Sequence, residues 1–432
     1  MSDQLSARDA ACVWHPYTQH GLEPDPLPIA SAEGAVLKTS DGRELIDAIS
    51  SWWAILHGHC HPRLSAAVAS QSATLDHVLF AGATHEPAVA LAEALVDVAP
   101  PGLSRVFYSD NGSTAVEVAM KMTYQRWAHE GHPERSLFIA LEGSYHGDTF
   151  GAMSIGDPDP FFAPFAPLLF ESLRVPPDPQ ALADALAREG DRVCAVIIEP
   201  LVQGAAGMAM HGEEFVRATR ALCDQHAIPL IADEVMTGFG RTGAMFACER
   251  AGIAPDVLCL SKGLTGGVLP LSATLTTQPM YEAFVADDRL RAFFHGHTFT
   301  AHPAGCAVAL ASLQLAQENN TPQLLDGIGA RIEAGVRHLA ESAAVRDVRR
   351  TGGIVAVELN PAPNDRAGYA AGIALRLRAA AIDRGVLLRP LGQVIYAMPP
   401  ACTSDAQCDR IAAVMSDLVD VASEHASSGS AR

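Results

Sequence analysis

The segment Pro229-Leu230-Ile231-Ala232-Asp233-Glu234-Val235 places two carboxylates at the end of an apolar run. A second apolar run, Val257 to Leu260, leads into Ser261-Lys262-Gly263, so a lysine stands 29 positions after Asp233. Short apolar runs that end in polar or glycine-rich turns are typical of buried strands in a parallel sheet. Because the carboxyl ends of such strands meet at one edge of the sheet, we expect Asp233, Lys262 and the turn Ser109 to Thr114 to lie close together.

The same pattern extends along much of the chain, from about Leu91. Apolar runs alternate with segments rich in Ala, Leu and Glu, which have the composition of crossover helices. The expected strands are Val106 to Ser109, Leu137 to Leu141, Val193 to Ile198, Pro229 to Ala232, Val257 to Leu260 and Leu271 to Thr276. The sequence therefore predicts an α/β fold whose large domain has a mainly parallel sheet flanked by helices.

After about residue 325 the pattern becomes α+β and predicts a second, smaller domain. Helices are expected over Gln323 to Ser342 and Gly368 to Arg384, and a last helix begins at a capping box of Ser404 and Gln407. The expected strands are Ile354 to Leu359, Val386 to Arg389 and Val394 to Met398.

The first fifty residues contain many prolines and glycines and predict a hairpin. Its strands, Ala35 to Lys38 and Glu44 to Ala48, flank the turn Ser40-Asp41-Gly42. Neither this segment nor the C-terminal region has much core of its own, so we expect them to pack together. The predicted organisation is an N-terminal segment, 1–60, that joins a small domain, 326–432, beside a large domain, 61–325.

The composition excludes several classes of function. With 432 residues, of which 49% are hydrophobic and 18% charged, the chain has enough apolar material for a compact enzyme. A net charge of −19 without a Lys/Arg cluster opposes nucleic-acid binding. Nine scattered cysteines without a CxxC pair favour reduced thiols over disulfides or a metal site. Without a signal-like start or an apolar run of roughly 18 residues, we expect a cytoplasmic protein with no membrane partner.

Lys262 and Asp233 have the chemistry of a pyridoxal phosphate site. An amine at a partly desolvated strand end has a lowered pKa, which favours Schiff-base formation and proton transfer. A carboxylate that closes an apolar run needs a cationic partner, and the protonated pyridine nitrogen of the cofactor is one. Either residue alone has an ordinary structural explanation, and Glu234 could equally be the paired acid. Together they predict transamination.

Two segments offer groups for the cofactor's phosphate. The turn Ser109 to Thr114 contains Gly112 and Ser113 and lies between an expected strand and a helix. Free backbone N–H groups and hydroxyls at such a helix start bind anions, although an ordinary helix cap explains the turn equally well. Thr298, in His295-Gly296-His297-Thr298-Phe299, is a second hydroxyl candidate.

Two further residues lie at or shortly after the ends of expected strands and suit contacts with a ligand. Tyr145, in Gly143-Ser144-Tyr145-His146-Gly147, could stack on the pyridine ring or simply cover the core. Arg389, in Leu388-Arg389-Pro390, could bind a substrate carboxylate with both guanidinium nitrogens or form a surface salt bridge.

Two other motifs look functional but fit their usual ligands poorly. The segment Gly238-Phe239-Gly240-Arg241-Thr242-Gly243 matches GxGxxG, yet no clear helix follows it and Lys262 stands where a dinucleotide site needs an acid. The segment His57-Gly58-His59-Cys60-His61 has a spacing that fits no common zinc site, so we expect a structural loop and no metal.

Taken together, the motifs resemble the class III (ω-amino acid) aminotransferases, a family of fold-type I pyridoxal phosphate enzymes. The resemblance runs from about Trp14 to Pro400 and is most specific at Asp233-Glu234-Val235, the Gly238 to Gly243 loop and Ser261-Lys262-Gly263. It implies a mainly parallel seven-stranded sheet in the large domain, a smaller α+β domain built from both ends of the chain, and a homodimer with shared active sites.

The resemblance also implies roles for individual residues. Lys262 is implied to form the Schiff base, Asp233 to contact the pyridine nitrogen and Tyr145 to stack on the ring. The implied phosphate ligands are Gly112, Ser113 and Thr298. In this family Thr298 and its neighbours Gly296 and His297 would come from the second subunit.

Three motifs narrow the resemblance within the family: Trp14 to Gln19, Ser51-Trp52-Trp53, and Leu388-Arg389-Pro390 with Tyr396 to Pro400. They resemble the members that transfer an amino group from S-adenosylmethionine to 8-amino-7-oxononanoate in biotin biosynthesis, by a ping-pong mechanism. Aromatic walls suit both an apolar keto-acid chain and a sulfonium cation. The implied substrate-site residues are Tyr17, Trp52, Trp53, Tyr145, Gly296 and Arg389.

Other reactions stay open at this stage. They are another class III ω-amino acid transaminase, a variant of the same step that takes lysine as amino donor, and a pyridoxal phosphate aminomutase. A nicotinamide oxidoreductase rests on the Gly238 loop alone.

Overall fold

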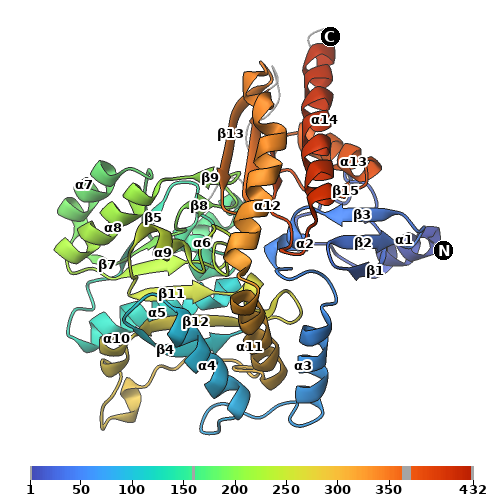
Figure 1. Cartoon of the computed structure of the whole chain (residues 1–432). Helices are drawn as coiled ribbons and strands as arrows, with labels where there is room; N and C mark the ends of the chain where they lie inside the picture. Colours follow the sequence, from blue (N-terminus) through green and yellow to red (C-terminus); the bar gives the residue numbers. More distant parts are fainter. Residues whose placement is uncertain (1, 158–160, 362–370, 430–432) are drawn as a thin grey trace.

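Figure 1 shows the computed structural model of the chain, which describes residues 2–157, 161–361 and 371–429. A large region surrounds a seven-stranded sheet, and a smaller region beside it contains both ends of the chain. No helix among the described residues is both long and apolar enough to cross a membrane.

The large sheet has the strand order β4-β12-β11-β10-β7-β5-β6. The strands are β4 (Leu103–Ser109), β5 (Leu137–Leu141), β6 (Ser172–Val175), β7 (Val193–Ile198), β10 (Leu230–Asp233), β11 (Val257–Leu260) and β12 (Ser272–Thr277). Of these, β12 runs antiparallel to both of its neighbours, and the other pairings are parallel. The predicted mainly parallel sheet is confirmed. The short edge strand β6, which is only partly buried, was not expected.

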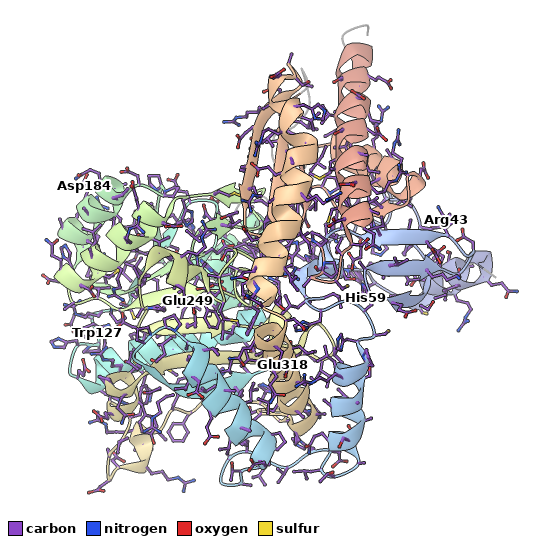
Figure 2. The ribbon with its side chains drawn as sticks, in the orientation of Figure 1. Arg43, His59, Trp127, Asp184, Glu249 and Glu318 are labelled. Atoms are coloured by element: carbon purple, nitrogen blue, oxygen red, sulfur yellow. The ribbon has the colours of Figure 1, made fainter. Side chains whose placement is uncertain are left out.

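Both faces of this sheet are covered, which explains why its strands are continuous apolar runs. Along β11, Leu258 and Leu260 pack in one core with helices on one face, whereas Val257 and Cys259 pack with helix α5 on the other. The helices around the sheet are α3 (Pro62–Ser72), α4 (Glu86–Val98), α5 (Gly112–His129), α6 (Phe150–Ile155), α7 (Pro179–Glu189), α8 (Glu213–Gln225), α9 (Ala247–Ala251), α10 (Gln278–Glu282) and α11 (Pro303–Glu318). Asp184 and Glu318 on these helices are exposed, and Figure 2 shows Asp184 at the outer edge of the large region.

The described part of the smaller region has two sheets, and three α-helices follow residue 320. Strands β13 (Val345–Thr351), β14 (Ile354–Leu359) and β16 (Val394–Ala397) form an antiparallel sheet. Its helices are α12 (Thr321–Val336), α13 (Ile373–Asp383) and α14 (Asp405–Gly429), and α14 packs against both of the others. The predicted capping box at the start of α14 is confirmed, because Ser404 and Gln407 exchange side-chain bonds with each other's backbone N–H.

The second small sheet joins the two ends of the chain. Its strands are β1 (Ile29–Glu33), β2 (Val36–Thr39), β3 (Glu44–Asp47) and β15 (Val386–Leu387). The expected hairpin is β2 and β3, and β15 pairs in parallel with β3 through Val386 and Ile46. The domain boundaries at residues 60 and 325 stay predictions.

The structure differs from the local predictions in one strand end and contains elements that were not predicted. A helix, α1 (Ser2–Cys12), precedes the hairpin, and β15 ends at Leu387, so Arg389 lies beyond the strand. Strand β13 was missed because Arg346, Asp347 and Arg350 interrupt its apolar pattern. The helix expected from Gly368 is α13, which begins at Ile373; its expected first residues lie outside the described part of the chain. The remaining α-helix and β-strands of the described residues are α2 (Ser50–Trp53), β8 (Val202–Gln203) and β9 (Ala209–Met210).

The GxGxxG motif is a packing surface between the two regions. Gly240 and Gly243 have positive φ angles, and the Cα of Pro322 in α12 would lie 3.0 Å from a Cβ on Gly240. Gly352, in the turn between β13 and β14, has a φ of +52, and a Cβ there would lie 2.2 Å from the carbonyl carbon of Thr242. The glycines of this loop therefore allow backbones to approach closely.

Gly352→Ala is expected to destabilise the protein by about 3 kcal/mol or more, because the new Cβ meets backbone atoms and the φ angle is strained. Gly252→Ala is the matched control, because Gly252 also has a positive φ, +66, but no atom lies within 4 Å of its Cβ position. The control should cost only about 1 kcal/mol. Denaturant unfolding measures both changes, and equal losses would contradict the close approach at Gly352.

Candidate active site

A cavity of about 180 Å³ lies where five strands of the large sheet end. It is lined by Asn111 after β4, Tyr145 after β5, Glu199 after β7, Asp233 at the end of β10 and Lys262 after β11. Gly112, Ser113 and Trp53 also line it. The expected convergence of the Ser109 to Thr114 turn, Asp233 and Lys262 at one edge is confirmed.

A second cavity, of about 320 Å³, adjoins the first, because Trp53, Tyr145 and Lys262 line both. Its other walls include the predicted substrate-site residues Tyr17, Trp52 and Arg389. The two cavities therefore place one lysine between a group of polar strand ends and a chamber with aromatic walls.

Lys262 begins the turn that follows β11 and has a φ of 43. Its Nζ lies 4.8 Å from the centroid of the Trp53 ring. Burial lowers the pKa of Lys262, and the nearby carboxylates of Asp233 and Glu199 oppose this shift in part. A fraction of neutral amine is thereby favoured, which nucleophilic and general-base chemistry both need.

Asp233 is only 5% exposed and its carboxylate is held from two sides. His146 Nδ1 lies 2.7 Å from Oδ2, and the Val235 N–H donates to Oδ1 at 3.1 Å. The neighbouring Glu234 turns away from the cavity and accepts bonds from the N–H groups of Ala247 and Cys248 at the start of α9. Of the two acids at this strand end, Asp233 lines the cavity and Glu234 caps a helix.

His146 and Glu199 also lie at this site and were not predicted from the sequence. His146 is fully buried beside Asp233, and its Nε2 has no hydrogen-bond partner among the described residues. Glu199 accepts bonds from the N–H groups of Tyr145 and Gly204. Burial raises the pKa of Glu199 to about 7, and Asp233 adds to the increase, while His146 and the two N–H donors oppose it. Glu199 could have been found, because it closes the apolar run of β7 as Asp233 closes that of β10.

The start of helix α5 forms another wall of the first cavity. Asn111 caps the helix by accepting from the Thr114 N–H at 3.1 Å, and the Thr114 hydroxyl in turn accepts from the Asn111 N–H. This box uses neither the Gly112 nor the Ser113 N–H, which lie in the first turn where N–H groups lack helical partners. The positive end of an 18-residue helix therefore faces the cavity with groups suited to an anion.

The second cavity has a polar cluster at its aromatic wall. The Tyr17 hydroxyl donates to Asp148 at 2.6 Å and lies 3.0 Å from the Tyr145 hydroxyl. The ring of Phe161 lies 5.8 Å from that of Tyr17 and 6.1 Å from that of Tyr145. Asp148 and Phe161 were not predicted; Asp148 could have been, since it closely follows Tyr145 in the same turn.

Arg389 stacks on Trp52 with its guanidinium carbon 4.5 Å from the ring centroid. Trp52 itself is 42% exposed, and its ring meets that of Tyr17 edge-on at 5.7 Å. Stacking uses the face of a guanidinium, whereas a carboxylate binds along its edge.

Three predicted residues lie apart from the two cavities described above. Gly296, His297 and Thr298 line neither one and belong to a loop in which Phe294 and Phe299 are 65% and 56% exposed. The His57 to His61 segment is also elsewhere: His57 pairs with Ser312 at 3.1 Å and His59 with Asp47 at 2.8 Å. No cluster of His, Cys, Asp and Glu that could hold a metal ion occurs within residues 2–157, 161–361 and 371–429.

Comparison with known proteins identifies several similar chains. The family model described as aminotransferase class-III matches residues 17–419. An adenosylmethionine-8-amino-7-oxononanoate aminotransferase from Synechococcus elongatus is 50% identical over 94% of this chain and 98% of its own length. A relative of the same name from Geobacter sulfurreducens is 44% identical over 93% of this chain and 94% of its own.

Solved structures are similar over nearly the whole chain. The adenosylmethionine-8-amino-7-oxononanoate aminotransferase from Methanocaldococcus jannaschii has a TM-score of 0.92 at 34% identity and covers 97% of this chain and 99% of its own. A PLP-bound amine transaminase from an uncultivated Pseudomonas species has a TM-score of 0.88 at 32% identity and covers 95% and 98%. The fold class predicted from the sequence is confirmed by these neighbours.

Glu199→Gln is expected to change how stability depends on pH. Because the pKa of Glu199 is raised from 4.5 to about 7, the folded protein holds a proton between these pH values that the unfolded chain has released. The wild-type protein should therefore lose about 3 kcal/mol of unfolding free energy, relative to the variant, as the pH rises through this window.

Denaturant titrations of both cofactor-free proteins between about pH 4.5 and 8 measure this difference. Above pH 7 the two curves should run parallel. A difference that stays constant across the whole range would contradict the raised pKa.

Proposed function

This chain belongs to the class-III aminotransferase family, and we propose that it transfers the amino group of S-adenosylmethionine to 8-amino-7-oxononanoate, giving 7,8-diaminononanoate in biotin biosynthesis. The relatives that share up to half of its residues are named for these substrates. The observation on which the proposal depends is that Lys262 joins the strand-end cavity to the aromatic chamber.

The proposed cofactor is pyridoxal phosphate, and the residues of the first cavity fit it. The start of α5 with Gly112 and Ser113 suits the phosphate, the Tyr145 ring suits the pyridine face, and the buried Asp233 carboxylate suits a protonated ring nitrogen. When bound, the cofactor supplies a conjugated ring that draws electrons from the carbon carrying the amino group.

The chain's own residues would then supply binding and proton transfer. Lys262, with its lowered pKa, would take the proton from that carbon through Nζ. His146 holds the Asp233 carboxylate in place, and this carboxylate would pair with the protonated ring nitrogen of the cofactor. Trp53 lies over the lysine and is itself buried, so it keeps water from this side of Nζ.

The second cavity would hold the two substrates in turn, as a ping-pong reaction requires. Arg389 would bind a substrate carboxylate, while Tyr17, Trp52 and Tyr145 would contact the apolar chain or the adenosyl group. Asp148 would bring a negative charge to the same wall, which favours a cationic donor. A lysine donor carries a cation too, so the donor must be distinguished by experiment.

We also propose that the protein is a cytoplasmic homodimer with shared active sites. The exposed loop with Gly296, His297 and Thr298 would supply the second subunit's site, and Thr298 would contact the phosphate there. All nine cysteines are free thiols, as expected for a reducing compartment.

Visible spectroscopy of the purified protein tests the reaction. S-Adenosylmethionine should bleach the cofactor band, lysine should leave it nearly unchanged, and 8-amino-7-oxononanoate should restore it. Bleaching by lysine and not by S-adenosylmethionine would show that lysine is the amino donor.

Lys262→Ala should lower turnover by about 10⁴-fold or more with little change in the far-ultraviolet spectrum, because no other amine lines the cavity. Normal turnover by the Lys262→Ala protein would refute the role of Lys262.

Mixing two inactive variants tests the shared site. In a dimer of Lys262→Ala and Thr298→Glu chains, one site has its native lysine from one subunit and its native threonine from the other. After the chains are unfolded and refolded together, about a quarter of wild-type activity should return if they assort at random. Each variant refolded alone is the control, and activity that does not rise in the mixture would contradict the shared site.

A further inference from the structure

The Ser50 to Trp53 turn has a backbone that few side chains adopt. Ser50, Ser51 and Trp53 have φ angles of 51, 59 and 68. Such left-handed residues persist only where surrounding contacts hold them, and they gather at functional sites. Here the turn carries Trp52 against Arg389 and Trp53 against Lys262.

One buried carboxylate holds the middle of this turn. Asp47, at the end of β3, is 0% exposed and accepts from the Ser51 N–H and the Ser51 hydroxyl, both at 2.9 Å. It also accepts from the Ile49 N–H at 3.2 Å. The fourth contact is His59, whose Nε2 lies 2.8 Å from Oδ2; since a carboxylate only accepts, this nitrogen carries the proton.

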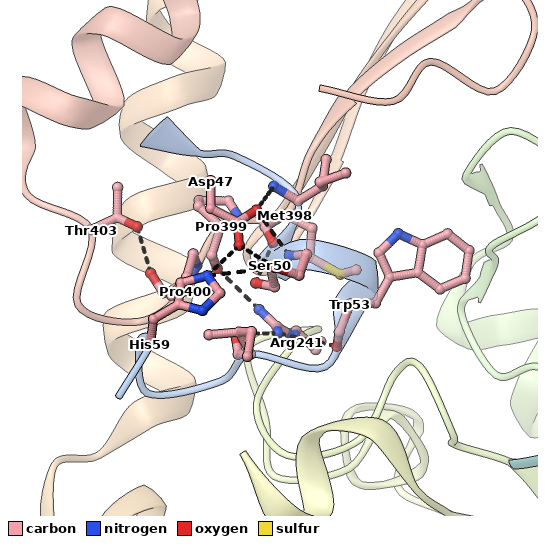
Figure 3. A network of polar contacts seen from close by, with 12 residues as sticks. Asp47, Ser50, Trp53, His59, Arg241, Met398, Pro399, Pro400 and Thr403 are labelled. Carbon is pink, nitrogen blue, oxygen red and sulfur yellow. Dashed lines mark hydrogen bonds and ion pairs between the residues drawn. The ribbon is translucent and has the colours of Figure 1, made fainter. Parts of the chain in front are cut away.

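The other bonds of the turn hold different atoms, as Figure 3 shows. Ser50 donates to the Met398 carbonyl at 2.8 Å, and Arg241 donates to the carbonyls of Trp53 and Pro399 at 3.3 and 3.0 Å. The Trp53 indole donates to the Tyr396 hydroxyl at 2.9 Å. These contacts fix the two ends of the turn, whereas Asp47 holds Ser51, the residue directly before Trp52.

We propose that His59 and Asp47 are positioning residues of the substrate site. His59 orients the Asp47 carboxylate toward Ser51, and Ser51 in turn sets the direction of Trp52. With Trp52 fixed, Arg389 stays stacked at 4.5 Å at the wall where a substrate carboxylate would bind. Neither His59 nor Asp47 lines either of the two site cavities, so both act through the tryptophan. The inference rests on the proposed use of the second cavity for substrates.

The test compares variants of the same network. His59→Leu removes the donor to Asp47, whereas His59→Gln keeps a donor nitrogen at a similar reach. Ser50→Ala is the matched control, because it removes one bond of the same turn without touching Ser51. The KM values of both substrates should rise about tenfold in His59→Leu and about threefold or less in the other two, with kcat nearly constant in all three.

A fluorescence measurement separates this inference from the proposed reaction, because it needs no turnover. The emission spectrum of Trp52 is obtained by subtracting the spectrum of the same protein with Trp52→Phe added. This emission should shift to the red in His59→Leu and stay in place in His59→Gln and Ser50→Ala. If His59→Leu fails to fold, Ser51→Ala replaces it in the test. This change removes one hydrogen bond to Asp47 at an exposed residue and should also shift the Trp52 emission to the red.

Two results would overturn the inference. One is a His59→Leu protein whose Trp52 emission matches the wild type, whatever its melting temperature. The other is a Ser50→Ala protein that raises KM as much as His59→Leu does, because a general loosening of the turn would then explain both. If the wild-type protein does not turn over the proposed substrates but the Trp52 emission shifts as predicted in the variants, the proposed substrates are wrong and the positioning role stands.

Discussion

The burial of ionisable groups at neighbouring strand ends is the constraint on which the rest of the site depends. Asp233 and Glu199 are 5% and 6% exposed, and the Lys262 ammonium shares their cavity. A charge removed from water is tolerated only where other charges and N–H donors compensate for it. His146 and the backbone of two turns supply that compensation, and in doing so they fix the geometry in which a proton can move.

A second buried charge connects the two regions of the chain. Arg241 is 1% exposed, and burial lowers its pKa to about 10, so it stays a cation at neutral pH. Its guanidinium donates to the carbonyls of Trp53, Ile55 and Pro399, which belong to segments far apart in the sequence. Gly243 and Gly352 allow the β13–β14 turn to contact the Gly238 to Gly243 loop, which contains Arg241. The GxGxxG segment resembles a nucleotide-binding loop in sequence, but in this protein it packs between an N-terminal turn, the small region and the large sheet.

Much of this arrangement could be predicted from local pattern. The apolar runs gave six of the seven strands of the large sheet, because strands buried on both faces contain few polar residues. Asp233, Lys262, Tyr145 and the Gly112 turn could be placed at one edge because each follows such a run. The charged strand β13 and the half-buried strand β6 were not predicted, because neither has the apolar run by which the other strands were recognised.

By itself the sequence determined the strand ends and the chemistry they bear, because that information lies in residues next to each other along the chain. The tertiary structure decided which of two adjacent acids faces the cavity, since Glu234 is turned toward α9 by backbone donors 13 and 14 residues away. It also decided that Asp47 and His59 support Trp52, and that His146 and Glu199 accompany Asp233. These are contacts between segments that only folding brings together, and no local periodicity encodes them.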